Sequence, residues 1–239
     1  MNRRKWLVLA ASLSFALVLA PIGMKQAQAQ APENAYSSMA PLDQYLMADR
    51  NAEIALARSA APDAISGDAK ILVLGRHGYE TAVEGKNGFV CLVERGWMSP
   101  SNAPEFWNPR IRGPICFNPP AARSVLPTTY KRTEMVLAGR TKAEIIAGNK
   151  AAFEKGELPP LEPGAMSYMM SKRAYLTDHE DHNLAHLMFY APPLEGKAWG
   201  ADLPDSPVML IPQFKGAQPI DVFIVPVGRW SDGSAAPVM

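Results

Sequence analysis

The sequence predicts an α+β fold with a mainly antiparallel sheet. Three short apolar runs come first, a block of helical patterns follows, and the last third returns to short runs rich in β-branched and aromatic residues. Strands in a block, then helices in a block, then strands again are typical of α+β domains. We therefore expect a three-stranded N-terminal meander, a central helical block and C-terminal strands.

The first 29 residues have the features of a secretory signal peptide. Residues 2–5 include three basic side chains, residues 6–20 form an uncharged apolar run, and Ala27-Gln28-Ala29 offers small residues where signal peptidase cleaves. We expect cleavage after Ala29 and an exported product, periplasmic or extracellular. An uncleaved membrane anchor is the alternative, but the run is shorter than the roughly 20 residues that span a bilayer. The Arg3-Arg4 pair also resembles a twin-arginine signal, a second export route.

The remaining chain, residues 30–239, is expected to form a single globular domain with a flexible start. The whole chain has 24 basic and 23 acidic residues, and the leader removes four basic ones, so the mature domain has a formal charge of −3. That balance argues against nucleic-acid binding. Basic residues form no run that would hold a membrane surface, so no membrane association is expected after cleavage. The ligand or protein partner is not predicted.

The first elements after the leader are one helix and three strands. Residues 41–60 begin with a proline, lack glycine and are rich in helix-forming residues, which predicts a helix. Three apolar runs follow at about 70–75, 79–84 and 89–95. Asn87-Gly88, between the second and third runs, is typical of a hairpin turn and favours a meander.

The central block is predicted to be helical. Asn118-Pro119-Pro120 can begin a short helix, and a second helical stretch runs from about 128 to 138. Thr141 followed by Glu144 is a capping box, and the helix it begins should end at Gly156. The runs AMSYMMS, HLMFYA, PVMLIPQF and IDVFIVPVG then predict the C-terminal strands.

The two cysteines, Cys91 and Cys116, are expected to form a disulfide because an exported chain folds in an oxidising compartment. The bridge would close a proline-rich loop and stabilise the fold by about 3 kcal/mol in the loop-entropy model. Two buried, unpaired thiols are the alternative. A redox-active pair is not indicated, because the cysteines lack Cys-x-x-Cys spacing.

Four stretches carry a resemblance to a known group of proteins. EGKNGFVCLVERGW, FWNPRIRGPICFNPPAARSVLP, EPGAMSYMMSK and VPVGRWSDG resemble a group of uncharacterised exported bacterial proteins with no assigned activity. The resemblance spans about residues 69–233. It implies one domain and an export route, and it transfers no catalytic or binding residue.

Three of the four histidines lie close together, at His179, His182 and His186. If this segment is helical, His182 and His186 lie one turn apart on the same face, and His179 lies three residues before. Three imidazoles suit a transition metal, with zinc or copper as the candidates. The segment lacks the His-Glu-x-x-His pattern of zinc peptidases. The alternative is an exposed polar turn without metal.

The proline-rich loop carries a second set of candidates for ligand binding. Trp97, Trp107, Arg110 and Arg112 are of types enriched at recognition surfaces, and a disulfide would preorganise the loop that holds them. The alternative is that the aromatic side chains pack on the sheet as a satellite core. The arginines would then pair with surface acids.

The function best supported by the sequence is an exported binding protein with a metal site centred on His182 and His186. The alternative is a metal-dependent hydrolase that uses the same histidines. The sequence does not decide whether the chain is an enzyme. It has no Gly-x-Ser-x-Gly nucleophile motif and no phosphate-binding loop, and it identifies neither a catalytic residue nor an organic cofactor site.

Overall fold

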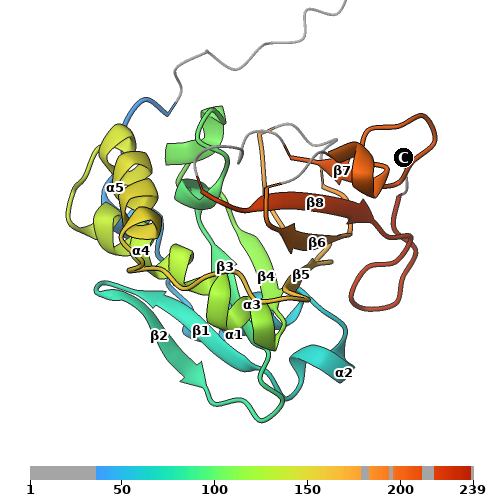
Figure 1. The fold of residues 1–239 in the computed structure, drawn as a ribbon. Coiled ribbons are helices and arrows are strands. Elements are labelled where there is room, and N and C mark those ends of the chain that lie inside the picture. The colour runs from blue at the N-terminus through green and yellow to red at the C-terminus, as the bar shows by residue number, and fades with distance from the viewer. Residues whose placement is uncertain (1–35, 179–182, 194–195, 212–217, 238–239) are drawn as a thin grey trace, which may run out of the picture. The chain divides into compact units, whose positions relative to one another are not determined.

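The described chain folds around an eight-stranded sheet (Figure 1). The structure is a computed structural model that describes residues 36–178, 183–193, 196–211 and 218–237. The expected signal peptide and most of the expected flexible start lie outside these residues. The strands are β1 Lys70–Gly75, β2 Gly78–Val83, β3 Val90–Glu94, β4 Gly113–Phe117, β5 Met166–Met169, β6 His186–Ala191, β7 Met209–Leu210 and β8 Asp221–Pro226.

The sheet is mainly antiparallel, which confirms the predicted α+β class. The strand order is β2-β1-β3-β4-β5-β6-β8-β7. Each neighbouring pair is antiparallel except β1 and β3, which run parallel. Each of the four C-terminal apolar runs predicted to be a strand contains one strand of the structure, β5, β6, β7 or β8.

The first three strands form where the sequence predicts them, but not as a meander. A meander needs β2 in the middle, whereas β1 pairs with both neighbours and β2 lies at the sheet edge. After β2 the chain crosses the start of β1, where the backbone N–H groups of Lys86 and Asn87 donate to the carbonyl of Asp68. Gly85 permits this crossing, because a Cβ there would lie 2.1 Å from the backbone nitrogen of Lys70.

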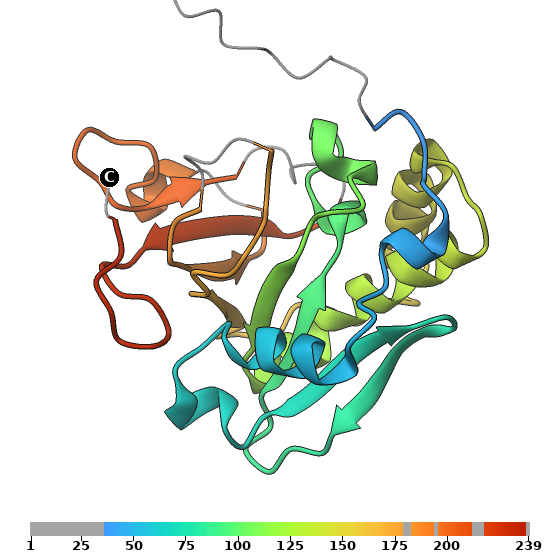
Figure 2. The same cartoon turned by 180° about the vertical axis from the view of Figure 1, so that it is seen from behind.

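The helices cover the two faces of the sheet, as Figures 1 and 2 show from opposite sides. One face is covered by α1, which contacts β1, β3 and β4, and the other by α3 and α4. Each face has a buried apolar cluster between the sheet and its helices. The helices are α1 Arg50–Arg58, α2 Asp63–Ser66, α3 Pro119–Ser124, α4 Leu126–Leu137 and α5 Lys142–Glu154.

The predicted helix at 41–60 is interrupted. A short 3₁₀ turn covers Leu42–Gln44, and α1 begins only after Asp49, whose carboxylate accepts hydrogen bonds from two backbone N–H groups of the first helical turn. The break has a tertiary cause. The backbone carbonyl of Tyr45 accepts a hydrogen bond from the buried guanidinium of Arg95, and the Tyr45 hydroxyl donates to the carbonyl of Trp107.

Helix α5 begins as the sequence predicts. The Thr141 side chain accepts from the backbone N–H of Glu144, and the Glu144 side chain accepts from the backbone N–H of Thr141. This capping box satisfies two of the backbone donors that a helix start leaves unpaired. The chain leaves the helix at Gly156, which has a φ of 70°.

A buried ion pair attaches α1 to the end of β3. A guanidinium nitrogen of Arg95 lies 2.8 Å from a carboxylate oxygen of Glu53, and the two side chains are 0% and 2% exposed. The same Glu53 oxygen accepts from the backbone N–H of Leu74.

In the described part of the chain, no helix is both long and apolar enough to span a bilayer.

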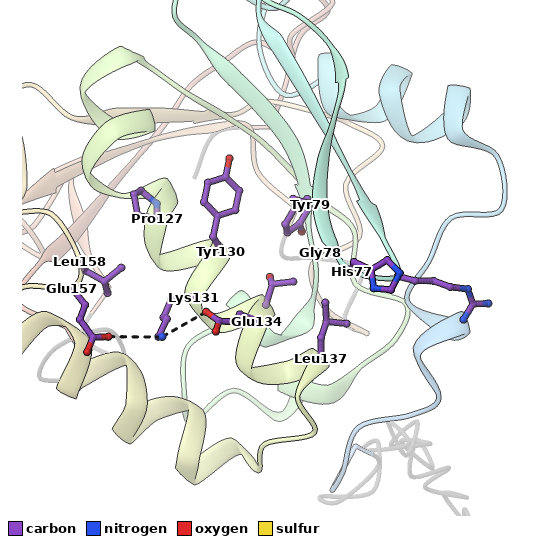
Figure 3. A pocket seen from close by; sticks show the side chains of 12 residues that line it. His77, Gly78, Tyr79, Pro127, Tyr130, Lys131, Glu134, Leu137, Glu157 and Leu158 are labelled. Carbon is purple, nitrogen blue, oxygen red and sulfur yellow. Dashed lines mark ion pairs between the residues drawn. The ribbon is translucent and has the colours of Figure 1, made fainter.

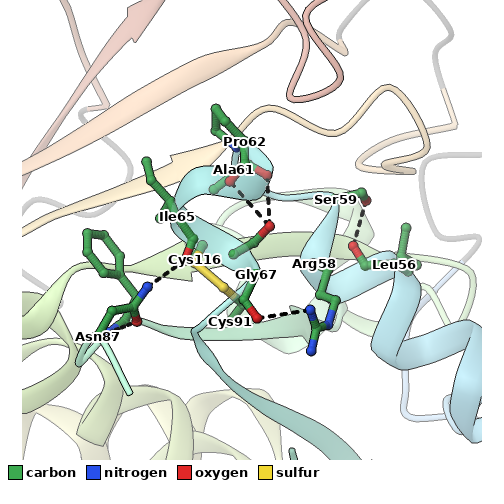
Figure 4. Close-up of a disulfide and its surroundings, with 12 residues drawn as sticks. Leu56, Arg58, Ser59, Ala61, Pro62, Ile65, Gly67, Asn87, Cys91 and Cys116 are labelled. Carbon is green, nitrogen blue, oxygen red and sulfur yellow. Dashed lines mark hydrogen bonds between the residues drawn. A yellow bond between two sulfur atoms is a disulfide. The ribbon is translucent and has the colours of Figure 1, made fainter. Parts of the chain in front are cut away.

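The disulfide between Cys91 and Cys116 joins β3 to β4 in the middle of the sheet (Figure 4). The two residues are directly opposite each other in the antiparallel ladder, and both are fully buried beneath α1. The bridge confirms the predicted pairing and rules out the alternative of two free thiols. It crosses between neighbouring strands at the base of the proline-rich loop, so it fixes both ends of that loop.

Candidate functional site

The histidine segment is described only at its two ends. His179 and His182 lie outside the described residues, so the predicted three-histidine cluster is not tested. His186 is described as the first residue of β6, and Asn183 to Ala185 before it are not helical. Among the described residues, no group of three or more His, Cys, Asp or Glu side chains is arranged to hold a metal ion.

His186 is held in one orientation. Its side chain is buried, and Nδ1 lies 2.7 Å from the backbone carbonyl oxygen of Leu184. A carbonyl can only accept, so Nδ1 carries the proton and Nε2 carries the lone pair. Burial lowers the pKa of His186 below its ordinary value, although the hydrogen bond to Leu184 acts in the opposite direction. The imidazole is therefore neutral near pH 7.

Asp178 fixes the chain just before the histidine segment. Its carboxylate accepts hydrogen bonds from the hydroxyls of Tyr36 and Tyr175, the amide of Asn108 and the guanidinium of Arg110 at 2.6–2.8 Å. Burial alone would raise the pKa of Asp178. The four donors outweigh burial and hold the pKa below its usual value. Asp178 is therefore an ionised anchor for two distant segments, at Tyr36 and at Asn108 and Arg110, and for the nearby Tyr175.

The aromatic candidates of the proline-rich loop lie in the core. Trp97 is fully buried, and its indole N–H donates to the hydroxyl of Thr133. Trp107 is 4% exposed and packs edge-on against Phe106 at 4.8 Å between ring centroids. Neither indole is accessible to a ligand from solvent. The alternative of a satellite core is the arrangement that the structure has.

The two arginine candidates of this loop are used inside the protein. Arg110 is exposed, but it pairs with Asp178 and lies over the ring of Tyr175, 5.2 Å from the centroid. Arg112 is partly buried and donates to the backbone carbonyls of Pro109 and Ile111. Burial lowers the pKa of Arg112 to about 10, with a further contribution from the charge of Arg95. The structure does not bring the two arginines and two tryptophans together at one surface.

An open cleft lies between the β1–β2 turn and α4 (Figure 3). Its volume of about 730 Å³ is in the range of small-molecule sites. His77 lies on one wall, at the β1–β2 turn. On the other wall Tyr130 is 41% exposed, and Lys131 lies 3.6 Å from Glu134 and 3.9 Å from Glu157. Lys131 is thus paired with two carboxylates of the same wall, so these charged groups do not converge on a common ligand position in the cleft.

A second cavity lies on the inner side of α4, between the helix and the sheet. It is small, about 50 Å³. Its apolar walls include Ile115 and Phe117 of β4 and Met188 of β6. Six polar side chains line it as well: Glu94, Thr128, Thr129, Arg132, Tyr190 and Gln218. Polar groups that converge on a pocket in an apolar layer are typical of binding sites.

The charged groups of this inner cavity have shifted pKa values. Burial raises the pKa of Glu94 to about 7, against a hydrogen bond from Thr129 and the charge of Arg132, which both lower it. Burial lowers the pKa of Arg132 to about 10. The charge of each group affects the pKa of the other, so the two lie near each other. In the described structure they form no ion pair, so neither charge is neutralised by direct contact with the other.

Two polar atoms at this cavity have no hydrogen-bond partner. Among the described residues, only three buried side-chain atoms are in that state: Thr128 Oγ1, Arg132 Nε and Asn149 Oδ1. The residues Thr128 and Arg132 are among those that line the inner cavity. The sequence carried a signal for this site: α4 buries Thr128, Thr129, Arg132 and Thr133 while Tyr130 is exposed. Four of the six buried residues of α4 are therefore polar, beside the apolar Leu126 and Val136, whereas the inner face of a surface helix is usually apolar.

Comparisons with known proteins give no family for this fold and its sites. No family model, curated protein or solved structure matches the chain. Its function has to be argued from the geometry of these residues.

Proposed function

We propose that the chain is an exported binding protein that holds a transition metal, zinc or copper, at a centre built on His186 with His182 and His179. The observation that carries this proposal is the fixed orientation of His186. Histidines that bind metals usually donate their second ring N–H to a backbone carbonyl or carboxylate, which fixes the tautomer and directs the other nitrogen at the metal. The Nδ1 contact of His186 with Leu184 has this form.

The anchoring of the neighbouring chain also supports the proposal. Asp178 is held by four donors on one side of the histidine segment. On the other side, the Asn183 amide donates to the carbonyl of Ala174, and the Ala185 carbonyl accepts from the backbone N–H of Val227. A ligand set with fixed flanks loses less conformational entropy when it closes around an ion.

The test is the metal content of the mature protein, purified without chelators or an affinity tag that contains histidine. We expect close to one equivalent of zinc or copper in the wild type and none in the double variant His182→Ala, His186→Gln. His77→Ala is the matched control, because His77 lies in the open cleft and should leave the metal content unchanged. Wild-type protein without zinc or copper, or a double variant that binds as the wild type does, would contradict the proposal.

The dependence of binding on pH gives a second readout. Metal ligands must be deprotonated, so metal binding should weaken as pH falls through the ordinary pKa of histidine, about 6.5. The lowered pKa of His186 keeps this ligand neutral further into acid, so the two other histidines should limit binding first. Metal-dependent hydrolysis of a chromogenic ester, abolished by His186→Gln, would identify the alternative, a hydrolase that uses the same centre.

A further inference from the structure

The buried face of α4 has an unusual composition that its internal contacts only partly explain. Thr133 accepts a hydrogen bond from Trp97, and Thr129 donates to Glu94. Thr128 and Arg132 are each 4% exposed. Within the described residues, the hydroxyl of Thr128 and Nε of Arg132 lack partners, and the other hydrogen bond of Arg132 is long, 3.4 Å from Nη1 to the carbonyl of Met98. Unpaired buried polar groups cost free energy, so a bound partner for these two is expected.

The inner cavity supplies the space for that partner. Its volume of about 50 Å³ is enough for about four water molecules or for one small organic ion. Gln218 and Glu94, which line it, are partly exposed, while Ile115, Phe117 and Val125 supply apolar lining. The ligand must therefore be small, with a polar end and at most a short apolar end.

The unpaired donors decide the charge of that ligand. Arg132 Nε is a donor on a cation, and the Thr128 hydroxyl is able to donate beside it. A carboxylate accepts two such bonds with its two oxygens, and charge-assisted bonds of this kind are the strong ones in a buried site. We infer that the cavity between α4 and the sheet binds a small monocarboxylate, of the size of formate or acetate, through Arg132 and Thr128. The methyl group of acetate would contact the apolar wall.

Glu94 couples this site to protons. The groups that face its carboxyl are Thr129 and Arg132 of α4, and the charge of Glu94 is also felt by Tyr79 of β2 and Tyr190 of β6. Both tyrosines are neutral at physiological pH because burial raises their pKa values. A second anion in the cavity is favourable only while Glu94 holds its proton. Carboxylate affinity should therefore fall as pH rises through about 7, where Glu94 ionises.

The experiment titrates the mature protein with sodium formate and sodium acetate at pH 6, with sodium chloride at equal ionic strength as the reference. Thermal unfolding should shift upward and saturate with either carboxylate but not with chloride, and calorimetry should give one site. The shift should shrink at pH 8. A carboxylate response equal to that of chloride at both pH values would overturn the inference and leave the cavity to water.

A pair of isosteric variants on the same helix tests the residues. Thr128→Val removes the unpaired hydroxyl, so the free protein should be at least as stable as the wild type while its acetate Kd rises about tenfold. Thr133→Val is the matched control. It removes the hydroxyl that binds Trp97, so it should lower stability and leave the acetate Kd unchanged. Equal effects of the two variants on the acetate Kd would sink the assignment.

Two further variants keep the test independent of folding and of the metal proposal. Arg132→Met should abolish the carboxylate response. If that variant does not fold, the Thr128→Val comparison still decides. Glu94→Gln should retain binding but lose its decline between pH 6 and 8, since glutamine does not titrate. His186→Gln should bind acetate as the wild type does, so failure of the metal centre and failure of this site give different results.

Discussion

The hydroxyl of Tyr36 donates a 2.7 Å hydrogen bond to the carboxylate of Asp178, 142 residues further along the chain. The bond attaches the start of the described chain to the residue just before the histidine segment. Arg110 donates to the same carboxylate, so one acidic side chain joins three regions.

We expect Tyr36→Phe to lower the free energy of unfolding by about 1 kcal/mol, because the partly buried bond to Asp178 and the longer, exposed bond that the hydroxyl accepts from Arg110 are lost. Asp178→Asn should cost more, about 2–3 kcal/mol, because four donors lose their charged acceptor. The pKa of Asp178 is lowered in the folded protein, so the ionised carboxylate stabilises the fold at neutral pH. This contribution to the free energy of unfolding is lost as pH falls through the lowered pKa. Denaturant unfolding measures both variants. Tyr130→Phe, at an exposed position in the cleft, should have no effect; a Tyr36→Phe result equal to it would contradict the role of this bond.

The Glu53–Arg95 pair should be far more important to stability than the exposed Arg123–Glu162 pair. Glu53→Gln leaves the fully buried Arg95 without its counter-charge, and we expect a loss of about 3–5 kcal/mol. Arg123→Gln breaks a pair whose arginine side chain is 60% exposed, and it should cost less than about 1 kcal/mol. Chemical denaturation of the two variants under one condition gives the comparison. Similar losses would show that burial does not control the strength of these pairs.

The raised pKa of Glu94 gives the folded protein a specific dependence on pH. Between about pH 4.5 and 7 the folded chain holds a proton on Glu94 that the unfolded chain has lost, so this group makes stability fall as pH rises. Glu94→Gln should lack this slope and should exceed the wild type by on the order of 1–3 kcal/mol at pH 8, in carboxylate-free buffer. Unfolding curves across that range check it, with the exposed Glu162→Gln as control. Parallel curves for wild type and Glu94→Gln would refute it.

Removal of the disulfide should weaken the whole domain. The double variant Cys91→Ala, Cys116→Ala should lose about 2–4 kcal/mol of unfolding free energy, because the unfolded chain gains the entropy of the released loop. Wild-type protein that is reduced after unfolding should show the same loss on refolding under reducing conditions. A variant as stable as the oxidised wild type would mean that the sheet alone sets the position of the loop.

Local signals in the sequence predicted local structure well. The capping box at Thr141 and Glu144 and the apolar runs of the C-terminal strands depend on neighbouring residues, and the structure has them as expected. The helix at 41–60 was predicted too long because Tyr45 bonds to Arg95, a contact across 50 residues that no local pattern records. Strand positions were therefore easier to predict than strand partners.

The order of the first three strands did have a signal, and the hairpin signal obscured it. Residues 71–74 of β1 are apolar throughout and at most 5% exposed, which is typical of a central strand, whereas β2 exposes Glu80 and Thr81 as an edge strand does. Asn87-Gly88 suggested a turn back onto β2. In the fold, Asn87 instead donates to the carbonyl of Ile65, so the same dipeptide makes the crossing over β1.

The candidate sites were predicted less well, for a physical reason. A sequence shows clusters of residues that are neighbours along the chain, and the aromatic side chains of the proline-rich loop, which form such a cluster, lie in the core. The inner cavity joins residues from β3, α4 and β6 that are far apart in sequence. The local clue was the set of threonines and one arginine on the buried face of α4. From the sequence alone, such polar residues are assigned to the solvent-exposed face of a helix.

For the exported chain that we propose, the position of the Cys91–Cys116 bridge implies an order of events. Both sulfur atoms lie in the middle of the sheet under α1, with no exposed surface on either residue. An oxidase acts on thiols that it can reach, so the bridge must form before α1 closes over β3 and β4. A chain that crosses the membrane unfolded presents both thiols to the oxidising side at the right time. A chain that folds first in a reducing compartment encloses them out of reach, so the proposed export would be transport of the unfolded chain.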